Sequence, residues 1–219
     1  MATSDTTKFN LDIDDIINEA YERCGLESRS GYDLKTARRS MNIMFAEWAN
    51  RGINLWAVEE RSKTLTAKLA EYSLGDDVVD IMEAAITKSS KDYRIERISR
   101  AQYLSFTDKT STGRPTQMYL QRSVVPKVFF YPTPDSTSTY TFKFQALTRI
   151  QDAGDDYTNT PEVPFRFLPC LISGLAYYIA MKFSPEKLPV LKQIYDEEWV
   201  RAAAEDRDNV SLHLVPGGN

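Results

Sequence analysis

Histidine is almost absent from this sequence of 219 residues: the only one is His213, close to the last residue. A Ser-His-Asp triad or a Cys-His pair needs a histidine that the fold holds in position. A histidine in a terminal segment lacks such an anchor. Cysteine is nearly as rare, and Cys24 and Cys170 stand far apart. Zinc sites need these residue types at short spacings such as C-x-x-C or H-E-x-x-H. The sequence therefore predicts neither triad nor zinc chemistry, and it predicts two reduced, buried thiols.

Other signatures are missing as well. No G-x-x-x-x-G-K-S/T or G-x-G-x-x-G run marks a nucleotide site. The longest apolar stretch, residues 167–181, is shorter than the roughly 18–20 residues of a membrane-spanning helix and is interrupted by Pro169 and Gly174. Residues 1–10 lack the basic and apolar regions of a secretory signal. We therefore expect a globular protein without cofactor or membrane segment, made in the cytoplasm.

Positive charge is not in excess. The chain has 27 lysines and arginines against 31 aspartates and glutamates, a net charge of −4. Free nucleic-acid binders rely on basic residues to neutralise phosphates, so the whole chain does not fit that class. One local exception is the basic cluster of Arg38 and Arg39 with Lys35 and Arg29. It is either a solvated helix face or a contact with an acidic partner or with DNA in a channel.

Two acidic clusters are the remaining candidates for chemistry, Gly-Asp-Asp-Val-Val-Asp at residues 75–80 and Asp-Ala-Gly-Asp-Asp at residues 152–156. Paired carboxylates could cleave glycans, and several oxygen ligands could hold a hard cation. Both clusters also have the composition of Asp/Gly turns, in which aspartate side chains bond the backbone. The turn interpretation is favoured, and the sequence predicts that the protein is not an enzyme.

Amphipathic helical patterns mark both ends of the chain. Apolar residues recur every three or four positions over residues 12–24 and again over residues 33–51, where Gly52 follows as a stop. Two further helices are expected at about 167–183 and 188–208. Pro169 and Pro189 fall in the first turns of these helices, where the missing N–H is harmless.

The middle of the chain, from Leu55 to about Thr148, has a different pattern. The apolar period falls to two, and β-branched and aromatic residues become frequent between clusters of turn residues. Expected strands are 56–66, 71–74, 82–87, 93–98, 117–121, 127–131 and 140–147.

Helical stripes need partners, and the helices at the two ends can supply each other. The sequence therefore predicts an α+β fold: an antiparallel-type four-helix bundle from the N- and C-terminal helices, with an inserted β-rich domain and an extended C-terminal tail. The expected parts are residues 1–54, the N-terminal helical half of the bundle; 55–160, the β-rich insertion; 161–208, the C-terminal helical half; and 209–219, the tail.

The tail and one tryptophan are further candidate interface residues. In the tail, Val210, Leu212 and Leu214 alternate with polar residues before Val215. An extended segment that is apolar on one side can add to a partner through main-chain bonds and side-chain pockets, so we expect these four residues to contact a partner protein or a neighbouring subunit. Trp56 fits an interface and a core position about equally well.

The order of several short motifs resembles that of phage head-to-tail adaptors. In residues 41–56, Trp48 precedes Gly52 and the pair Leu55-Trp56, as in the passage from the second helix to the first strand of those proteins. The similar motifs that follow are Glu71-Tyr72-Ser73-Leu74, Asp77-Val78-Val79-Asp80-Ile81, Gly113-Arg114-Pro115-Thr116, Tyr131-Pro132-Thr133-Pro134-Asp135 and Gly174-Leu175-Ala176-Tyr177-Tyr178-Ile179-Ala180. The order of these motifs covers nearly the whole chain. The sequence thus resembles the tail tubular protein A and tail accessory factor family of short-tailed bacteriophages.

This resemblance implies a structural protein of the virion neck or tail. Adaptors of that family form a ring of about twelve copies on the portal protein, join it to the tail nozzle and continue the DNA channel. Double-stranded DNA passes through such a ring without specific binding, and a contact with tail fibres fits the same role. The family needs no cofactor and no membrane.

Two other classes stay open at this point. A virion-associated cell-wall glycan hydrolase would use acidic residues of the β-rich region. A host cytosolic interaction module would have the same composition but no role in a virion.

Overall fold

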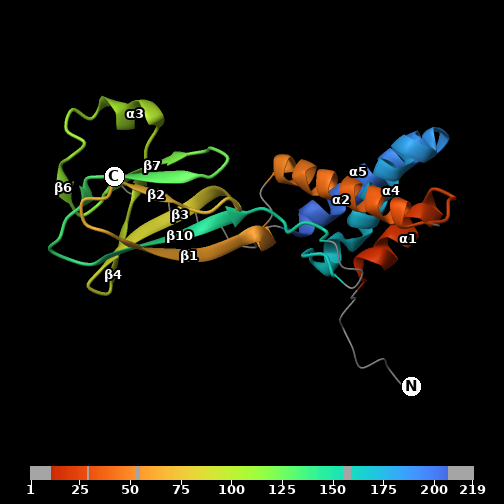
Figure 1. The fold of residues 1–219 in the computed structure, drawn as a ribbon, viewed down its shortest axis with the longest axis horizontal. Helices are drawn as coiled ribbons and strands as arrows, with labels where there is room; N and C mark the ends of the chain where they lie inside the picture. The colour runs from red at the N-terminus through yellow and green to blue at the C-terminus, as the bar shows by residue number, and fades with distance from the viewer. Residues whose placement is uncertain (1–10, 29, 53–54, 155–158, 207–219) are drawn as a thin grey trace, which may run out of the picture. The chain divides into compact units, whose positions relative to one another are not determined.

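The computed structural model describes residues 11–28, 30–52, 55–154 and 159–206 (Figure 1). The chain divides into two compact units. The helical unit comprises Met1–Trp56 and Ile150–Asn219, and the β unit comprises Ala57–Arg149. The β unit is therefore an insertion, which the chain enters and leaves once. The four parts expected from the sequence, with limits at 54/55, 160/161 and 208/209, stay a prediction.

The described part of the helical unit contains four α-helices and two short 3-10 turns. Their bounds are α1 (Ile13–Arg23), α2 (Gly31–Arg51), η2 (Phe165–Phe167), α4 (Leu168–Phe183), η3 (Pro185–Lys187) and α5 (Leu188–Glu205). The Asp12 carboxylate caps α1 by accepting a hydrogen bond from the Asp15 backbone N–H at 2.8 Å. Ser30 and Asp33 form a reciprocal capping box at the start of α2.

Helix α4 is the centre of the helical unit. It packs against α1, α2 and α5, and its residues are buried without interruption from Cys170 to Ala176. Gly174 makes the close approach of these helices possible. A Cβ atom at this position would lie 2.5 Å from Met44 Sδ on α2 and 2.7 Å from Tyr195 Cε2 on α5.

The predicted antiparallel-type four-helix bundle is wrong. Helix α1 has only 11 residues against 21 in α2, whereas the members of a bundle run side by side over similar lengths. Because α4 is apolar on nearly all sides, it is the shared partner of the other helices. Helix α5 buries only Leu191, Tyr195 and Ala202, and it crosses α2 in Figure 1. The structure contains both helices and sheets, as predicted for an α+β protein. The predicted extended tail, residues 209–219, lies outside the described residues.

The β unit is built from two four-stranded sheets and a two-stranded ribbon. Its strands are β1 (Val58–Leu65), β2 (Glu71–Ser73), β3 (Val78–Lys88), β4 (Lys91–Arg94), β5 (Glu96–Arg97), β6 (Thr112–Gly113), β7 (Gln117–Gln121), β8 (Lys127–Tyr131), β9 (Thr133–Pro134) and β10 (Tyr140–Thr148). The strand order is β1-β10-β3-β4 in the first sheet and β2-β8-β7-β5 in the second, with β6 paired to β9. Side chains of both large sheets share one core, where the ring centroids of Phe130 and Phe142 lie 4.9 Å apart. The two sheets therefore form a sandwich.

Several details of the β unit differ from the sequence expectation. The strand expected at 93–98 is divided into β4 and β5, which belong to different sheets. The first strand begins at Val58, because residues 55–57 form the 3-10 turn η1 (Leu55–Ala57). The strand expected at 82–87 begins earlier, at Val78, and its pairing with β10 is irregular, with a register shift between Phe144 and Ala146. A short helix, α3 (Arg100–Ser105), lies in a segment for which no element was expected.

Candidate interaction surfaces

Trp56 belongs to the aromatic centre of the helical unit. Its ring centroid lies 4.3 Å from that of Phe167, which in turn lies 5.8 Å from that of the fully buried Trp48. Trp48 Nε1 donates a hydrogen bond of 2.8 Å to the Tyr195 hydroxyl, which donates to Glu47 at 2.8 Å. Trp56 thus packs within its own unit, and its role at an interface stays a prediction.

Arg38 and Arg39 are adjacent in sequence but have different surroundings. Arg38 Nη2 lies 3.0 Å from Asp14 Oδ1, and its side chain is 12% exposed, so it ties α2 to α1. Arg39 is exposed. Close to it, Lys182 Nζ donates to the Ser40 hydroxyl at 2.6 Å. Burial, and secondarily the positive charge of Arg39, lower the pKa of Lys182.

The fully exposed residues of α2 have charge of one sign only, whereas Asp33 and Glu47 of the same helix are half-buried. The exposed residues of this helix, all of whose positions the structure describes, are Gly31, Tyr32, Lys35, Arg39, Asn42, Ile43, Ala46, Ala49 and Asn50. None of them is acidic, and most lie on one side of a 3.6-residue helix. We call these residues together with Lys182 the basic face. Arg39 is the only residue of the predicted interface set on this face.

A groove of about 510 Å³ lies between α1, α4 and α5. Its lining residues are Arg23, Ser173, Glu186, Lys187, Val190, Leu191 and Ile194. Arg23 Nη1 donates to the Ser173 hydroxyl, and Arg23 Nε to Glu19, each at 2.9 Å. Elsewhere on α1, Asp15, Asn18 and Glu22 are exposed to solvent. The charged residues that line the groove are of both signs: Arg23 and Lys187 are positive and Glu186 is negative.

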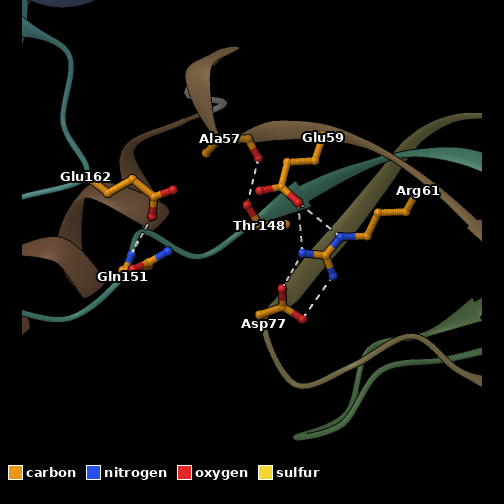
Figure 2. A network of polar contacts seen from close by, with 7 residues as sticks. All are labelled: Ala57, Glu59, Arg61, Asp77, Thr148, Gln151 and Glu162. Carbon is orange, nitrogen blue, oxygen red and sulfur yellow. Dashed lines mark hydrogen bonds and ion pairs between the residues drawn. The ribbon is translucent and has the colours of Figure 1, made fainter.

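Several acidic residues of the β unit, among them Asp77 and Asp80 of the first acidic cluster, are engaged in ion pairs. Figure 2 shows the Arg61 guanidinium between Asp77 and Glu59, with Arg61 Nη1 3.1 Å from Asp77 Oδ1 and Nη2 2.9 Å from Glu59 Oε2. The hydrogen bond from Arg61 lowers the pKa of Asp77. Asp80, 17% exposed, pairs with Arg97 at 2.9 Å and with Arg122.

These pairs connect different elements and so have a structural role. Arg61 lies on the edge strand β1 with Asp77 in the turn before β3, and Asp80 joins β3 to Arg97 of β5 in the other sheet. In the other acidic segment, Asp152 Oδ1 accepts a hydrogen bond from the Gly154 N–H at 2.9 Å, as expected of a turn. Within the described residues, no group of three or more His, Cys, Asp or Glu side chains could hold a metal ion.

Hydrogen bonds anchor the chain on both sides of the passage between the units (Figure 2). Within the β unit, the Thr148 hydroxyl donates to the Ala57 carbonyl at 3.0 Å, which joins the end of β10 to the start of β1. Within the helical unit, the Gln151 N–H donates to the Glu162 carboxylate at 3.2 Å. The insertion therefore begins and ends at residues that are held in place.

Helix α3 covers a cluster of half-buried aromatic residues that the sequence reasoning missed. The Tyr103 ring stacks on Tyr119, with centroids 5.6 Å apart, and lies 5.5 Å from Phe129. The Phe106 ring stacks on Tyr131 at 3.9 Å. A signal for α3 was present, because Ser99 and Gln102 have the S-x-x-Q spacing of a capping box. The groove between α1, α4 and α5 had no such signal, since residues of separate helices line it.

Comparison with known families identifies the class of protein to which these two units belong. The family model described as SU10 adaptor protein matches residues 4–214. The chain therefore belongs to the SU10 adaptor protein family. No curated protein sequence matches the chain.

Family membership confirms the coarser part of the resemblance found in the sequence: a structural, head-to-tail adaptor role in a bacteriophage. It implies a place in the tail or neck of the virion and contacts with portal and tail components, and it suggests a non-enzymatic role. No helix in the described ranges is both long and apolar enough to cross a membrane.

Proposed function

We propose that this chain is the head-to-tail adaptor of a short-tailed bacteriophage, of the type formed by tail tubular protein A and tail accessory factors. The observation that supports this most strongly is the family match over residues 4–214. About twelve copies form a ring beneath the portal protein, connect it to the tail nozzle and continue the DNA channel. The protein is made in the host cytoplasm and incorporated into the virion, where it also contacts tail fibres.

Double-stranded DNA passes through this ring without specific binding. The net charge of −4 supports this part of the proposal, because tight DNA binding comes mainly from basic residues that neutralise phosphates. Arg38, the more buried of the two candidate arginines, is held by Asp14. The exposed Arg39 is better placed to contact a protein partner.

The tail beyond residue 208 makes the contact with the portal or with a neighbouring subunit. Val210, Leu212, Leu214 and Val215 supply the apolar side of an extended segment, whose main-chain groups pair with the partner. Trp56, whose ring packs against Phe167, is proposed as a further interface residue.

Co-sedimentation with purified portal protein tests the adaptor role and the tail together. The full chain should sediment with the portal, whereas a chain ending at residue 208 should keep its thermal transition and lose portal binding. A chain with Val210, Leu212 and Leu214 changed to serine should behave like the truncated one. Its matched control, with Ser211 and His213 changed to alanine, should bind like the wild type.

The outcomes separate the two claims. If the full chain does not bind the portal, the adaptor proposal fails. If the full and truncated chains bind equally well, the adaptor role stands and the assignment of the tail is wrong.

A further inference from the structure

An ion pair within the helical unit holds the end of α5. Asp206, the C-cap of this helix, has a side chain that is only 4% exposed. One of its carboxylate oxygens accepts a hydrogen bond from the guanidinium of Arg166, which lies 40 residues earlier in the chain on η2. The Asp206 N–H donates to the Ala202 carbonyl at 3.2 Å. The last turn of α5 is therefore closed by a backbone bond and tied to η2.

The charge of Arg166 suits this position. The last turn of α5 contains no basic residue, whereas Glu205 and Asp206 stand at its end. Backbone carbonyls give the end of a helix a partial negative charge, so carboxylates there are unfavourable and cations are favourable. Arg166 supplies from another element the positive charge that the end of α5 lacks.

The turn η2 contacts α5 at a second point. The Phe167 ring is 1% exposed, and its centroid lies 6.0 Å from that of Trp199 in an edge-to-face arrangement. Trp199 and Asp206 are about two helical turns apart, which places them on the same side of α5. Phe167 and Arg166 thus hold the last two turns of α5 from neighbouring positions of η2.

We propose that Arg166 is a positioning residue for the tail of residues 209–219. Its ion pair with Asp206 fixes the point at which the chain leaves α5, and so keeps the apolar side chains of the tail close to their pockets on the portal. This inference rests on the proposed contact between tail and portal. Because only residues 207–209 stand between Asp206 and Val210, the position of Asp206 limits where the tail can bind.

Loss of the pair acts through the length of this connection. Without the charge of Arg166, the buried Asp206 carboxylate favours uncoiling of the last turn of α5, which returns it to water. One turn contains about 3.6 residues, so the connection between the ordered helix and Val210 roughly doubles. The effective concentration of a tethered group falls as about the −3/2 power of the length of its connection, and a doubling therefore reduces it by about threefold.

Titration of purified portal with the full chain, followed by co-sedimentation, measures this effect. Arg166→Ala should weaken portal binding by about threefold and accelerate amide exchange over residues 203–206. Arg166→Asp combined with Asp206→Arg restores opposite charges and should restore binding. The matched control is Arg201→Ala, which should bind like the wild type, because the Arg201 side chain is 69% exposed and forms its ion pairs within α5.

An insertion separates positioning from stability. Three glycines placed directly after Asp206 double the connection of residues 207–209 and leave the ion pair with Arg166 in place. This chain should unfold like the wild type and bind the portal about threefold more weakly. A purely structural role of Arg166 predicts instead that the chain with the insertion binds like the wild type.

The results distinguish the inference from the function on which it rests. If Arg166→Ala or the chain with the insertion binds the portal like the wild type, the positioning role of Arg166 is wrong, although the adaptor role and the tail contact stand. If a peptide of residues 207–219 alone binds the portal as tightly as the full chain, the connection has no effect and the inference is also overturned. Equal binding by the full chain and a chain ending at residue 208 would refute the tail contact, and the inference with it. If the full chain does not bind the portal, the adaptor proposal itself fails.

Discussion

Gly174 sets how closely the central helix can approach its neighbours. Replacing it with alanine improves helix propensity, but the new Cβ would lie 2.5 Å from Met44 Sδ and 2.7 Å from a ring carbon of Tyr195. Overpacking of this kind costs about 1–3 kcal/mol, so Gly174→Ala should lower the free energy of unfolding measured in urea by that amount.

Gly31 provides the matched control. A Cβ atom there meets nothing within 4 Å, and the residue begins α2. Gly31→Ala should therefore leave the free energy of unfolding unchanged or slightly higher. Equal destabilisation by both substitutions would contradict the close packing of α4 against α2 and α5.

The ion pair between Arg61 and Asp77 predicts a pH dependence at the residue scale. The hydrogen bond from Arg61 holds the pKa of Asp77 below its ordinary value of 3.8 in the folded protein. A carboxyl with a depressed folded pKa stabilises the fold fully above its unfolded pKa, and this stabilisation is lost as the pH falls through the folded value. Because the Asp77 side chain is 44% exposed, the effect is small.

Asp77→Asn should therefore unfold at lower urea concentration than the wild type near neutral pH, and the two curves should converge below a pH of about 4. The adjacent, exposed Asp76 is the control position, and Asp76→Asn should follow the wild type throughout. A difference between Asp77→Asn and the wild type that grows as the pH falls would contradict the assigned pair.

At the scale of single elements, α3 depends on one side chain. None of its residues is buried, and Tyr103 holds it by stacking on Tyr119 and lying against Phe129. Tyr103→Ala should release the helix, so that amide exchange over residues 100–105 becomes much faster while the main unfolding transition of the protein changes little. Leu104→Ala, at a side chain 59% exposed, should leave exchange as in the wild type. Unchanged protection in Tyr103→Ala would show that other contacts hold α3.

Local signals in the sequence located most of the elements. The Asp12 cap and apolar period predicted α1, and alternation predicted β10, because both depend on neighbours in sequence. The arrangement of the helices depended on distant residues. The nearly continuous apolar run of residues 167–181 is typical of a helix that is buried on all sides. Such a helix is expected at the centre of its unit, with the other helices around it, rather than at one corner of a four-helix bundle.

The candidate surfaces could be predicted only in part. The sequence singled out Arg38 and Arg39 as one cluster, but adjacent residues on a helix point in different directions, and only Arg39 is exposed. Ion pairing of Asp80 with Arg97 and Arg122 joins residues far apart in the chain, and no spacing rule reveals such pairs. Structure was therefore needed to show how the acidic residues of the β unit are used.

At the scale of the whole molecule, the β unit has a core of its own. The buried residues of both sheets contact one another, and β1 and β10 pair in continuous register from Val58 with Leu147 to Leu65 with Tyr140. The two ends of the insertion therefore meet, as Thr148 and Ala57 also show. A domain of this kind can fold when separated from the rest of the chain.

Residues 57–149 expressed alone should consequently give dispersed amide signals in NMR and a cooperative thermal transition. The complementary chain, in which a short glycine-serine linker replaces residues 58–148, should keep a cooperative transition of the helical unit. An excised β unit with the collapsed spectrum of an unfolded chain would show that its core is completed by the helical unit.

The central claim is that this chain assembles as a ring on the portal. Electron microscopy of negatively stained particles, after mixing the purified protein with purified portal, tests it most directly. The account predicts an added ring of about twelve subunits on one end of the portal, with an open central channel. Portal particles that keep their original outline at saturating concentrations of the protein would contradict the account.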